Sequence, residues 1–210
     1  MRLKMKLIAL FVAATGLIQP LWAGEARDQL DNFYKNMHTL QADFDQKLIS
    51  VKGEVQQQVS GKVYLQRPGL FRWDYSAPYE QMIMADSQKL TIYDVDLEQV
   101  TIRTIDQTLG QTPAVVLSGE GDLDESFNII ELEPKDNRLW VALTPRNKEA
   151  NFVRMKLGFH NSELSQMALE DTFGQNTIIT LNNIQRNKVL PHGIFEFKAP
   201  AGVDVIGDLD

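Results

Sequence analysis

Apolar residues recur at steps of three and four along the chain after residue 24. Seven of them have the spacing that places side chains on one side of an α-helix: Ala26, Leu30, Phe33, Met37, Leu40, Phe44 and Leu48. Charged residues such as Asp28, Lys35 and Lys47 fall between them. The pattern predicts one amphipathic helix over residues 25–49, which ends before Gly53.

Beyond Gly53, apolar and polar positions alternate with the two-residue period of a β-strand. Phe71, Trp73 and Tyr75 share one face of such a strand. Short strands separated by turn signals are predicted at 59–65, 71–75, 81–85, 90–94, 97–105, 129–133, 138–143, 152–159, 164–170, 176–184 and 194–197. Roughly ten short strands at regular spacing predict a mainly β (α+β) protein with one large antiparallel sheet, curved or nearly closed.

The strand pattern is interrupted over residues 106–128. Thr112-Pro113 combines a hydroxyl cap with a proline at the first helical turn, which is typical of a helix start. Residues 122–127 predict a second short helical turn. Helices in this region could cover one face of the sheet.

Positions 1–23 combine the features of a secretory signal peptide. Arg2, Lys4 and Lys6 are basic, residues 7–17 are mainly apolar, and Ala23 is a small residue before the expected cut. An uncleaved anchor is the alternative, but the apolar run is shorter than the ~20 residues that span a bilayer. We expect residues 1–23 to be cleaved after export, and residues 24–210 to form a single domain without stable membrane insertion.

The chain has 210 residues, a formal net charge of −7 and no cysteine. Without the three basic residues of the first 23 positions, 18 basic residues remain against 28 acidic ones, a balance of −10. An acidic chain lacks the basic face that nucleic-acid binding needs. The absence of cysteine excludes disulfides, thiolate metal sites and lipidation of a cysteine. We expect an exported acidic protein that is stabilised by packing alone.

Motifs for catalysis and metal binding are missing from the sequence. No two of the three histidines, His38, His160 and His192, have the spacing of metal ligands. Neither a Gly-x-Ser-x-Gly elbow nor a Ser-x-x-Lys motif is present. We therefore expect no enzyme activity, no metal site and no cofactor.

An open sheet has two faces, and the few predicted helices could cover only one of them. The predicted strands nevertheless carry many large apolar side chains. Methionine, which adapts its shape, suits surfaces that receive variable apolar partners. Two interpretations stay open: an ordinary β core, or a cleft between sheet and helices that takes up an apolar ligand. In the second interpretation the candidate lining residues are Phe71, Trp73, Tyr75, Met82, Met84, Leu90, Ile92, Val100, Ile102, Met155 and Met167.

Arg67 has the same parity as Phe71, Trp73 and Tyr75, although Pro68 and Gly69 intervene. If the alternation of side chains continues through Pro68 and Gly69, the guanidinium of Arg67 points to the apolar side of the sheet and must find hydrogen-bond acceptors there. Carbonyls at helix ends could supply them, so that Arg67 would join the sheet to covering helices as a latch. A turn arginine in solvent is the equally weighted alternative.

Several motifs together resemble the LolA family of lipoprotein carriers, in the family's order and over the whole chain after residue 23. The Arg-Pro-x-x-Phe-x-Trp block is the most specific of them. The matching positions are Phe44-Asp-Gln46, Arg67-Pro-Gly-Leu-Phe71-Arg-Trp73-Asp-Tyr75, 78–81, Asp86, Leu90, Tyr93-Asp-Val-Asp-Leu-Glu-Gln-Val-Thr101, Thr112-Pro113 and Phe195-Glu-Phe197-Lys-Ala-Pro200-Ala-Gly202-Val203. One departure is Asp86-Ser87, where the family usually has Asp-Gly.

The resemblance implies an unclosed antiparallel β-barrel covered by an α-helical lid, with a hydrophobic cavity for the acyl chains of lipoproteins. It implies a periplasmic chaperone that receives its cargo from the inner-membrane ABC transporter LolCDE and delivers it to the outer-membrane acceptor LolB. It further implies that Arg67 bonds lid carbonyls in the closed form and that Phe71 affects cargo release. A lipid- or lipoprotein-sensing module with the related fold of the envelope-stress regulator RseB is the alternative.

Overall fold

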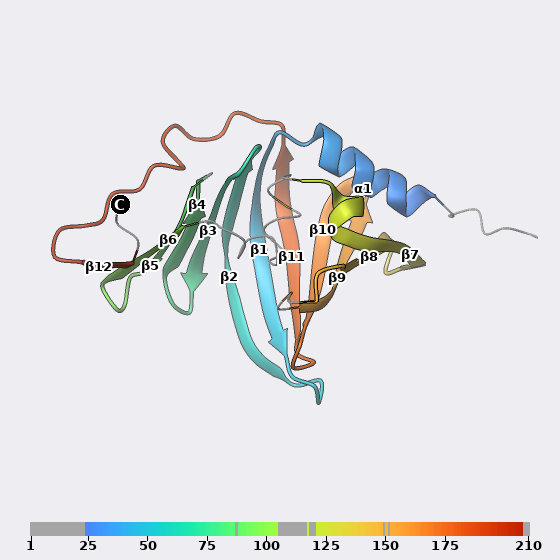
Figure 1. Ribbon diagram of the computed structural model, residues 1–210, viewed down its shortest axis with the longest axis horizontal. Helices are drawn as coiled ribbons and strands as arrows, with labels where there is room; N and C mark the ends of the chain where they lie inside the picture. Colours follow the sequence, from blue (N-terminus) through green and yellow to red (C-terminus); the bar gives the residue numbers. More distant parts are fainter. Residues whose placement is uncertain are drawn as a thin grey trace, which may run out of the picture.

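The computed structural model describes residues 24–86, 88–104, 117, 121–148, 150 and 152–207. In this part of the chain, two helices accompany a 12-stranded sheet (Figure 1). The helices are α1 (Glu25–Asn36) and α3 (Leu123–Ser126). The strands are β1 (Thr39–Ile49), β2 (Val55–Gln66), β3 (Leu70–Ala77), β4 (Gln81–Ala85), β5 (Lys89–Asp94), β6 (Gln99–Thr104), β7 (Phe127–Lys135), β8 (Arg138–Pro145), β9 (Phe152–His160), β10 (Glu163–Asp171), β11 (Asn176–Arg186) and β12 (Asp204–Gly207). The predicted signal peptide and the helix start at Thr112-Pro113 lie outside the described residues.

The strands follow the order β12-β6-β5-β4-β3-β2-β1-β11-β10-β9-β8-β7. Neighbouring strands are antiparallel except for the pair β12–β6, which is parallel. The sheet curves strongly, and its edge strands β12 and β7 lie at opposite ends of the order (Figure 1). The predicted mainly β fold with one curved, unclosed sheet is therefore confirmed.

The prediction of one helix over residues 25–49 is wrong beyond Asn36. Helix α1 ends there, and β1 begins at Thr39. Leu40, Phe44 and Leu48 are four residues apart, a spacing that fits one face of a helix and equally one face of a strand. The strand prevails because residues 39–49 pair with β2 on one side and β11 on the other.

Helix α1 covers part of one face of the sheet, which we call the inner face. Its apolar side packs on β7–β10, and the ring of Phe33 meets that of Phe159 at a centroid distance of 6.0 Å. At its first turn, the Glu131 carboxylate of β7 accepts hydrogen bonds from the backbone N–H groups of Gly24 and Arg27. A carboxylate at this position satisfies unpaired N–H groups and complements the helix dipole.

The opposite face, which we call the outer face, is covered near β3–β6 by residues 187–203. This segment runs along the edge of the molecule and returns as β12 beside β6 (Figure 1). The ring of Phe197 packs on Tyr93 at 5.6 Å, and Nη1 of Arg72 donates to the carbonyl oxygen of Ile194. The predicted strand at 194–197 is thus wrong: these residues form turns and irregular backbone, while β12 lies further along the chain.

Candidate functional site

An aromatic cluster lies on the inner face where β1, β2 and β3 run side by side. The ring centroids of Phe44 and Trp73 are 4.7 Å apart, and those of Phe44 and Tyr75 are 5.3 Å apart. Gly61 of β2 lies between them, opposite Phe44 on one side and Tyr75 on the other. Because Gly61 has no side chain, the rings meet across the strand.

An apolar cavity of about 300 Å³ adjoins this cluster. Its lining side chains come from both halves of the curved sheet and from Leu117, whose side chain is buried. They are Gln46, Leu65, Phe71, Trp73, Tyr75, Ile83, Leu90, Leu117, Met155, Met167, Leu169, Thr177 and Ile179. The volume lies at the lower end of the roughly 300–1,000 Å³ that small-molecule sites occupy.

The structure brings six of the candidate lining residues together around this cavity: Phe71, Trp73, Tyr75, Leu90, Met155 and Met167. Ile92 pairs with Ile83 and so projects from the inner face, but it is not among the lining residues. Both the sheet halves and the covering residues are needed to enclose the space, so the cavity exists only in the folded chain.

Four other candidates lie on the outer face, and their assignment to the cavity is wrong. In the β3–β4 ladder, Met82 is opposite Asp74 and Met84 is opposite Arg72. The same pairing carries on into β5 and β6, where it places Val100 and Ile102 on the outer face too. Met82, Met84 and Val100 are nevertheless buried, because residues 187–203 cover this face.

Several lining residues were not predicted from the sequence. Ile83 is the clearest case, because it lies between two methionines that were assigned to its face. Pairing of β3 with β4 across 78–80 places Ile83 opposite Trp73. That register was the signal that could have identified Ile83, since directly paired residues share a face.

Arg67 connects the sheet to the covering helices. Its Nε donates to the carbonyl oxygen of Leu117 at 3.1 Å, and its Nη1 donates to the carbonyl oxygens of Phe33 at 3.3 Å and of Tyr34. The guanidinium carbon also lies 5.3 Å from the ring centroid of Phe33 and 4.9 Å from that of Tyr34. The last turn of α1 and residue 117 are thereby held to the same side chain.

The environment of Arg67 combines burial with these acceptors. Burial lowers the pKa of its guanidinium to about 10, so the side chain remains a cation at neutral pH. The carbonyls of Phe33 and Tyr34 lie in the last turn of α1, where most carbonyl groups lack partners within the helix. The Phe33 carbonyl also accepts from the backbone N–H of Met37 at 3.2 Å, so Arg67 is its second donor. A cation at a helix C-terminus is further favoured by the helix dipole.

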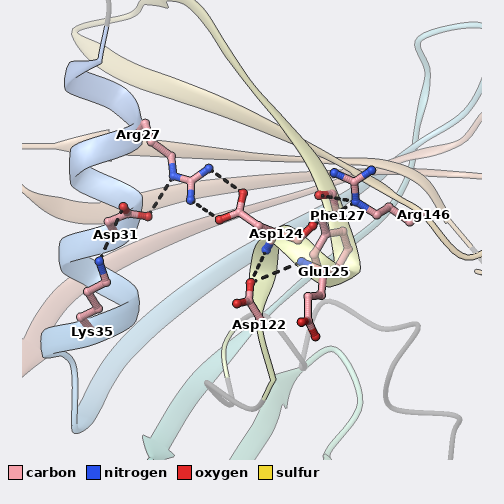
Figure 2. Close-up of polar contacts among 8 residues, drawn as sticks. All are labelled: Arg27, Asp31, Lys35, Asp122, Asp124, Glu125, Phe127 and Arg146. Carbon is pink, nitrogen blue, oxygen red and sulfur yellow. Dashed lines mark hydrogen bonds and ion pairs between the residues drawn. The ribbon is translucent and has the colours of Figure 1, made fainter.

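A second set of polar contacts joins α1 to α3 (Figure 2). The guanidinium of Arg27 donates from Nη1 and Nη2 to both carboxylate oxygens of Asp124, at 3.0 and 2.6 Å, and from Nε to Asp31 at 2.9 Å. This hydrogen bonding with Arg27 lowers the pKa of Asp124. Asp122 caps α3 by accepting from the N–H groups of Asp124 and Glu125, which confirms the predicted short helical turn.

We refer to α1, Leu117 and α3 as the lid. Arg67 lies beneath it, and the Arg27–Asp124 pair lies at its exposed rim. The hydroxyl of Tyr34 in α1 also donates to the carbonyl oxygen of Gly121 at 2.6 Å. These polar contacts add to the apolar packing of α1 on the sheet, in which Leu30 and Phe33 are fully buried.

Solved structures share the fold at low sequence identity. An uncharacterized conserved protein from Thermus thermophilus aligns with a TM-score of 0.54 at 12% identity, covering 88% of this chain and 98% of that one. The Pseudomonas aeruginosa MucA/MucB complex contains a chain that aligns with a TM-score of 0.52 at 10% identity, covering 84% of this chain and 61% of that one. These likenesses show the fold alone. In the described part of the chain, no helix is long and apolar enough to cross a bilayer.

Sequence relatives are much closer. The outer-membrane lipoprotein carrier protein of Dechloromonas aromatica (strain RCB) is 38% identical over 208 residues, covering 98% of this chain and 100% of that protein. The carrier protein of the same name from Methylococcus capsulatus (strain Bath) is 41% identical over 182 residues, covering 87% and 88%. The model of the family "Outer membrane lipoprotein carrier protein LolA" matches residues 35–198. The chain therefore belongs to the LolA family of outer-membrane lipoprotein carrier proteins.

Proposed function

We propose that this protein takes up the acyl chains of lipoproteins and carries them through the periplasm to the outer membrane. The observation that carries the proposal is the apolar cavity of about 300 Å³ beneath a non-covalently held lid. Each CH₂ group removed from water contributes about 0.8 kcal/mol, so a lipid-anchored protein needs such shielding to cross an aqueous space. Belonging to the LolA family supports the same cargo.

The lid offers a way to release the cargo without an energy source. In the closed state, Arg67 donates to three carbonyl oxygens, two in α1 and that of Leu117. A protein that binds only when open has its apparent affinity reduced by the fraction of molecules that are open. The proposed role of Arg67 is therefore that of a latch, which keeps binding reversible. Neither catalysis nor a cofactor has a part in this cycle.

In this proposal, one partner at each membrane sets the direction of transport. The ABC transporter LolCDE of the inner membrane supplies the lipoprotein, and LolB of the outer membrane accepts it. The chain itself is cleaved after residue 23 and moves between the two membranes. Phe71, Trp73, Tyr75, Leu90, Met155 and Met167 are the proposed contacts for the acyl chains, together with Ile83.

A photocrosslinking experiment in cells tests the proposal. A photoreactive residue at Phe71 lies on the cavity wall, whereas the same residue at Val153 lies on the exposed outer side of β9. We expect adducts with lipoproteins at position 71 and none at position 153. Absence of adducts at 71, or equal adducts at both positions, would contradict uptake of cargo into the cavity.

A further inference from the structure

A second, polar cavity of about 330 Å³ adjoins the apolar one. The two share Gln46 and Tyr75 in their linings. Beyond these shared residues, the polar cavity is lined by Gln57, Tyr79, Gln81 and Asp94, and by the apolar side chain of Val59. Gln57 is exposed and Tyr79 is 66% exposed, so this side of the combined space reaches solvent.

The polar side chains form a row across the inner face, at the strand ends remote from Arg67. Tyr75 is opposite Gln81 in the β3–β4 ladder, and Gln81 is opposite Asp94 in the β4–β5 ladder. Arg67 follows β2 and precedes β3, at the other end of these strands. An elongated apolar ligand that lies under the lid would therefore present its end to this row.

The groups in the row are mostly neutral and only loosely paired with one another. The Tyr75 hydroxyl lies 3.5 Å from Oε1 of Gln46, and Nε2 of Gln81 lies 3.5 Å from Oδ2 of Asp94. Both distances are at the long limit of hydrogen bonding. Burial raises the pKa of Tyr75, which keeps its phenol neutral. Each glutamine amide can both donate and accept, so a ligand with carbonyl or N–H groups can exchange for these weak contacts.

We propose that this row binds the ester and amide groups by which acyl chains are joined to the lipoprotein, and that Asp94 disfavours free fatty acids. The inference rests on the proposed function and defines its ligand more closely. An acyl chain bound in the apolar cavity ends in a carbonyl group that would otherwise lose its hydrogen bonds to water. The row supplies donors where that loss would occur. In a free fatty acid the same position is a carboxylate, which the Asp94 carboxylate repels.

A two-probe binding assay on the chain lacking residues 1–23 tests the row. One probe is a dipalmitoylated cysteinyl peptide, which has ester and amide groups; the other is diphenylhexatriene, a hydrocarbon that has neither. The variant is Gln57→Leu combined with Gln81→Leu. The matched control is Gln58→Leu, which changes the same residue type one position along β2, on the outer face.

We expect the double variant to weaken binding of the lipopeptide by about 5-fold or more, since a neutral hydrogen bond contributes about 1 kcal/mol. Binding of diphenylhexatriene should stay within about twofold, and Gln58→Leu should change neither probe. Equal losses for both probes, or no loss beyond that of the control, would overturn the inference. If the unmodified chain binds diphenylhexatriene but not the lipopeptide, the proposed function fails as well, so the two failures are distinguishable.

Substitution of Asp94 tests the exclusion of free fatty acids. In the unmodified chain, Oδ1 of Asp94 accepts a hydrogen bond from the backbone N–H of Leu97 at 3.1 Å. The side-chain carbonyl oxygen of Asn can accept the same hydrogen bond, so we expect Asp94→Asn to retain the turn. At pH 7.5 we expect Asp94→Asn to bind palmitate at least 3-fold more tightly and the lipopeptide within twofold of the unmodified chain. An unchanged affinity for palmitate would show that Asp94 does not discriminate.

Discussion

Ile83 lies directly opposite Trp73 in the β3–β4 ladder, so both side chains project onto the inner face and line the same cavity. One residue further along, Met84 is opposite Arg72 and is buried instead on the outer face, which residues 187–203 cover. A single step along β4 thus separates two apolar environments. One is an open cavity and the other is packed core.

Filling the cavity from β4 should block cargo binding without unfolding the protein. Ile83→Trp places a larger apolar side chain into existing space, so we expect a loss of less than about 1.5 kcal/mol in the free energy of unfolding. Binding of a dipalmitoylated peptide should fall at least 10-fold. Met84→Ala should do the reverse. We expect it to lower the free energy of unfolding by about 2–4 kcal/mol, while the folded fraction binds the peptide with unchanged affinity. Urea denaturation and fluorescence titration measure both, and equal binding by the two variants would contradict the assignment of faces.

Removing the Arg67 guanidinium should favour the open lid. Arg67→Leu loses charged hydrogen bonds to three carbonyl oxygens but also relieves the burial of a cation, so we expect a small change in global stability. Amide hydrogen exchange in the last turn of α1 should accelerate. Apparent affinity for the lipopeptide should rise up to about tenfold, because more molecules are open, and transfer to an acceptor should slow. Arg67→Lys keeps the positive charge, so its exchange rate and its lipopeptide affinity should lie between those of Arg67→Leu and the unmodified chain. If amide hydrogen exchange in α1 is unchanged in either variant, Arg67 is not a latch.

The Arg27–Asp124 pair should make lid closure sensitive to acid. Arg27 lowers the pKa of Asp124 in the folded protein. A carboxylate with a lowered folded-state pKa stabilises the protein above its unfolded value of about 3.9, and this contribution is lost as the pH falls through the folded value. We expect the stability difference between the unmodified chain and Asp124→Asn to be constant near neutral pH and to decrease progressively as the pH falls below about 4. Thermal unfolding at several pH values measures it.

Glu125→Gln provides the control for this titration. Its side chain is in the same helix as Asp124 but points away from Arg27 (Figure 2). The stability difference between this variant and the unmodified chain should lack the acid-dependent loss assigned to Asp124. If both variants follow the same pH profile, the Arg27 contact is not its cause.

Gly61 should be irreplaceable by alanine. A Cβ atom there would lie 1.8 Å from the carbonyl oxygen of Asp74 and 2.9 Å from the Phe44 ring. Because the first of these is backbone, β2 and β3 must separate, and we expect Gly61→Ala to cost at least about 3 kcal/mol. In Gly158→Ala the atoms nearest to the new Cβ all belong to the ring of Trp140, at 2.8–2.9 Å. A side-chain ring can move where backbone cannot, so the cost of Gly158→Ala should be clearly smaller. Urea denaturation that ranks the two variants equally would contradict this account.

Local patterns predicted much of the fold. The alternation of Phe71, Trp73 and Tyr75 placed three side chains on one face, and the structure has them there. Asp122 with the residues after it predicted a short helix, which α3 is. Both features depend on neighbours within a few residues, where backbone geometry alone determines the direction of side chains. For residues 39–49 the local pattern fitted helix and strand alike, and pairing with β2 and β11 decided the outcome.

The sequence by itself determined that a large curved β-sheet with aromatic and methionine side chains would form. Only the tertiary structure decided which of those side chains face the cavity. Met82, Met84, Val100 and Ile102 lie on the outer face because the register of β3–β6 puts them there, and residues 187–203 then cover that face. The acceptors of Arg67 were decided in the same way, since they come from α1 and Leu117. Strand alternation is a local property, whereas register and the covering of a face depend on segments that meet only when the chain folds.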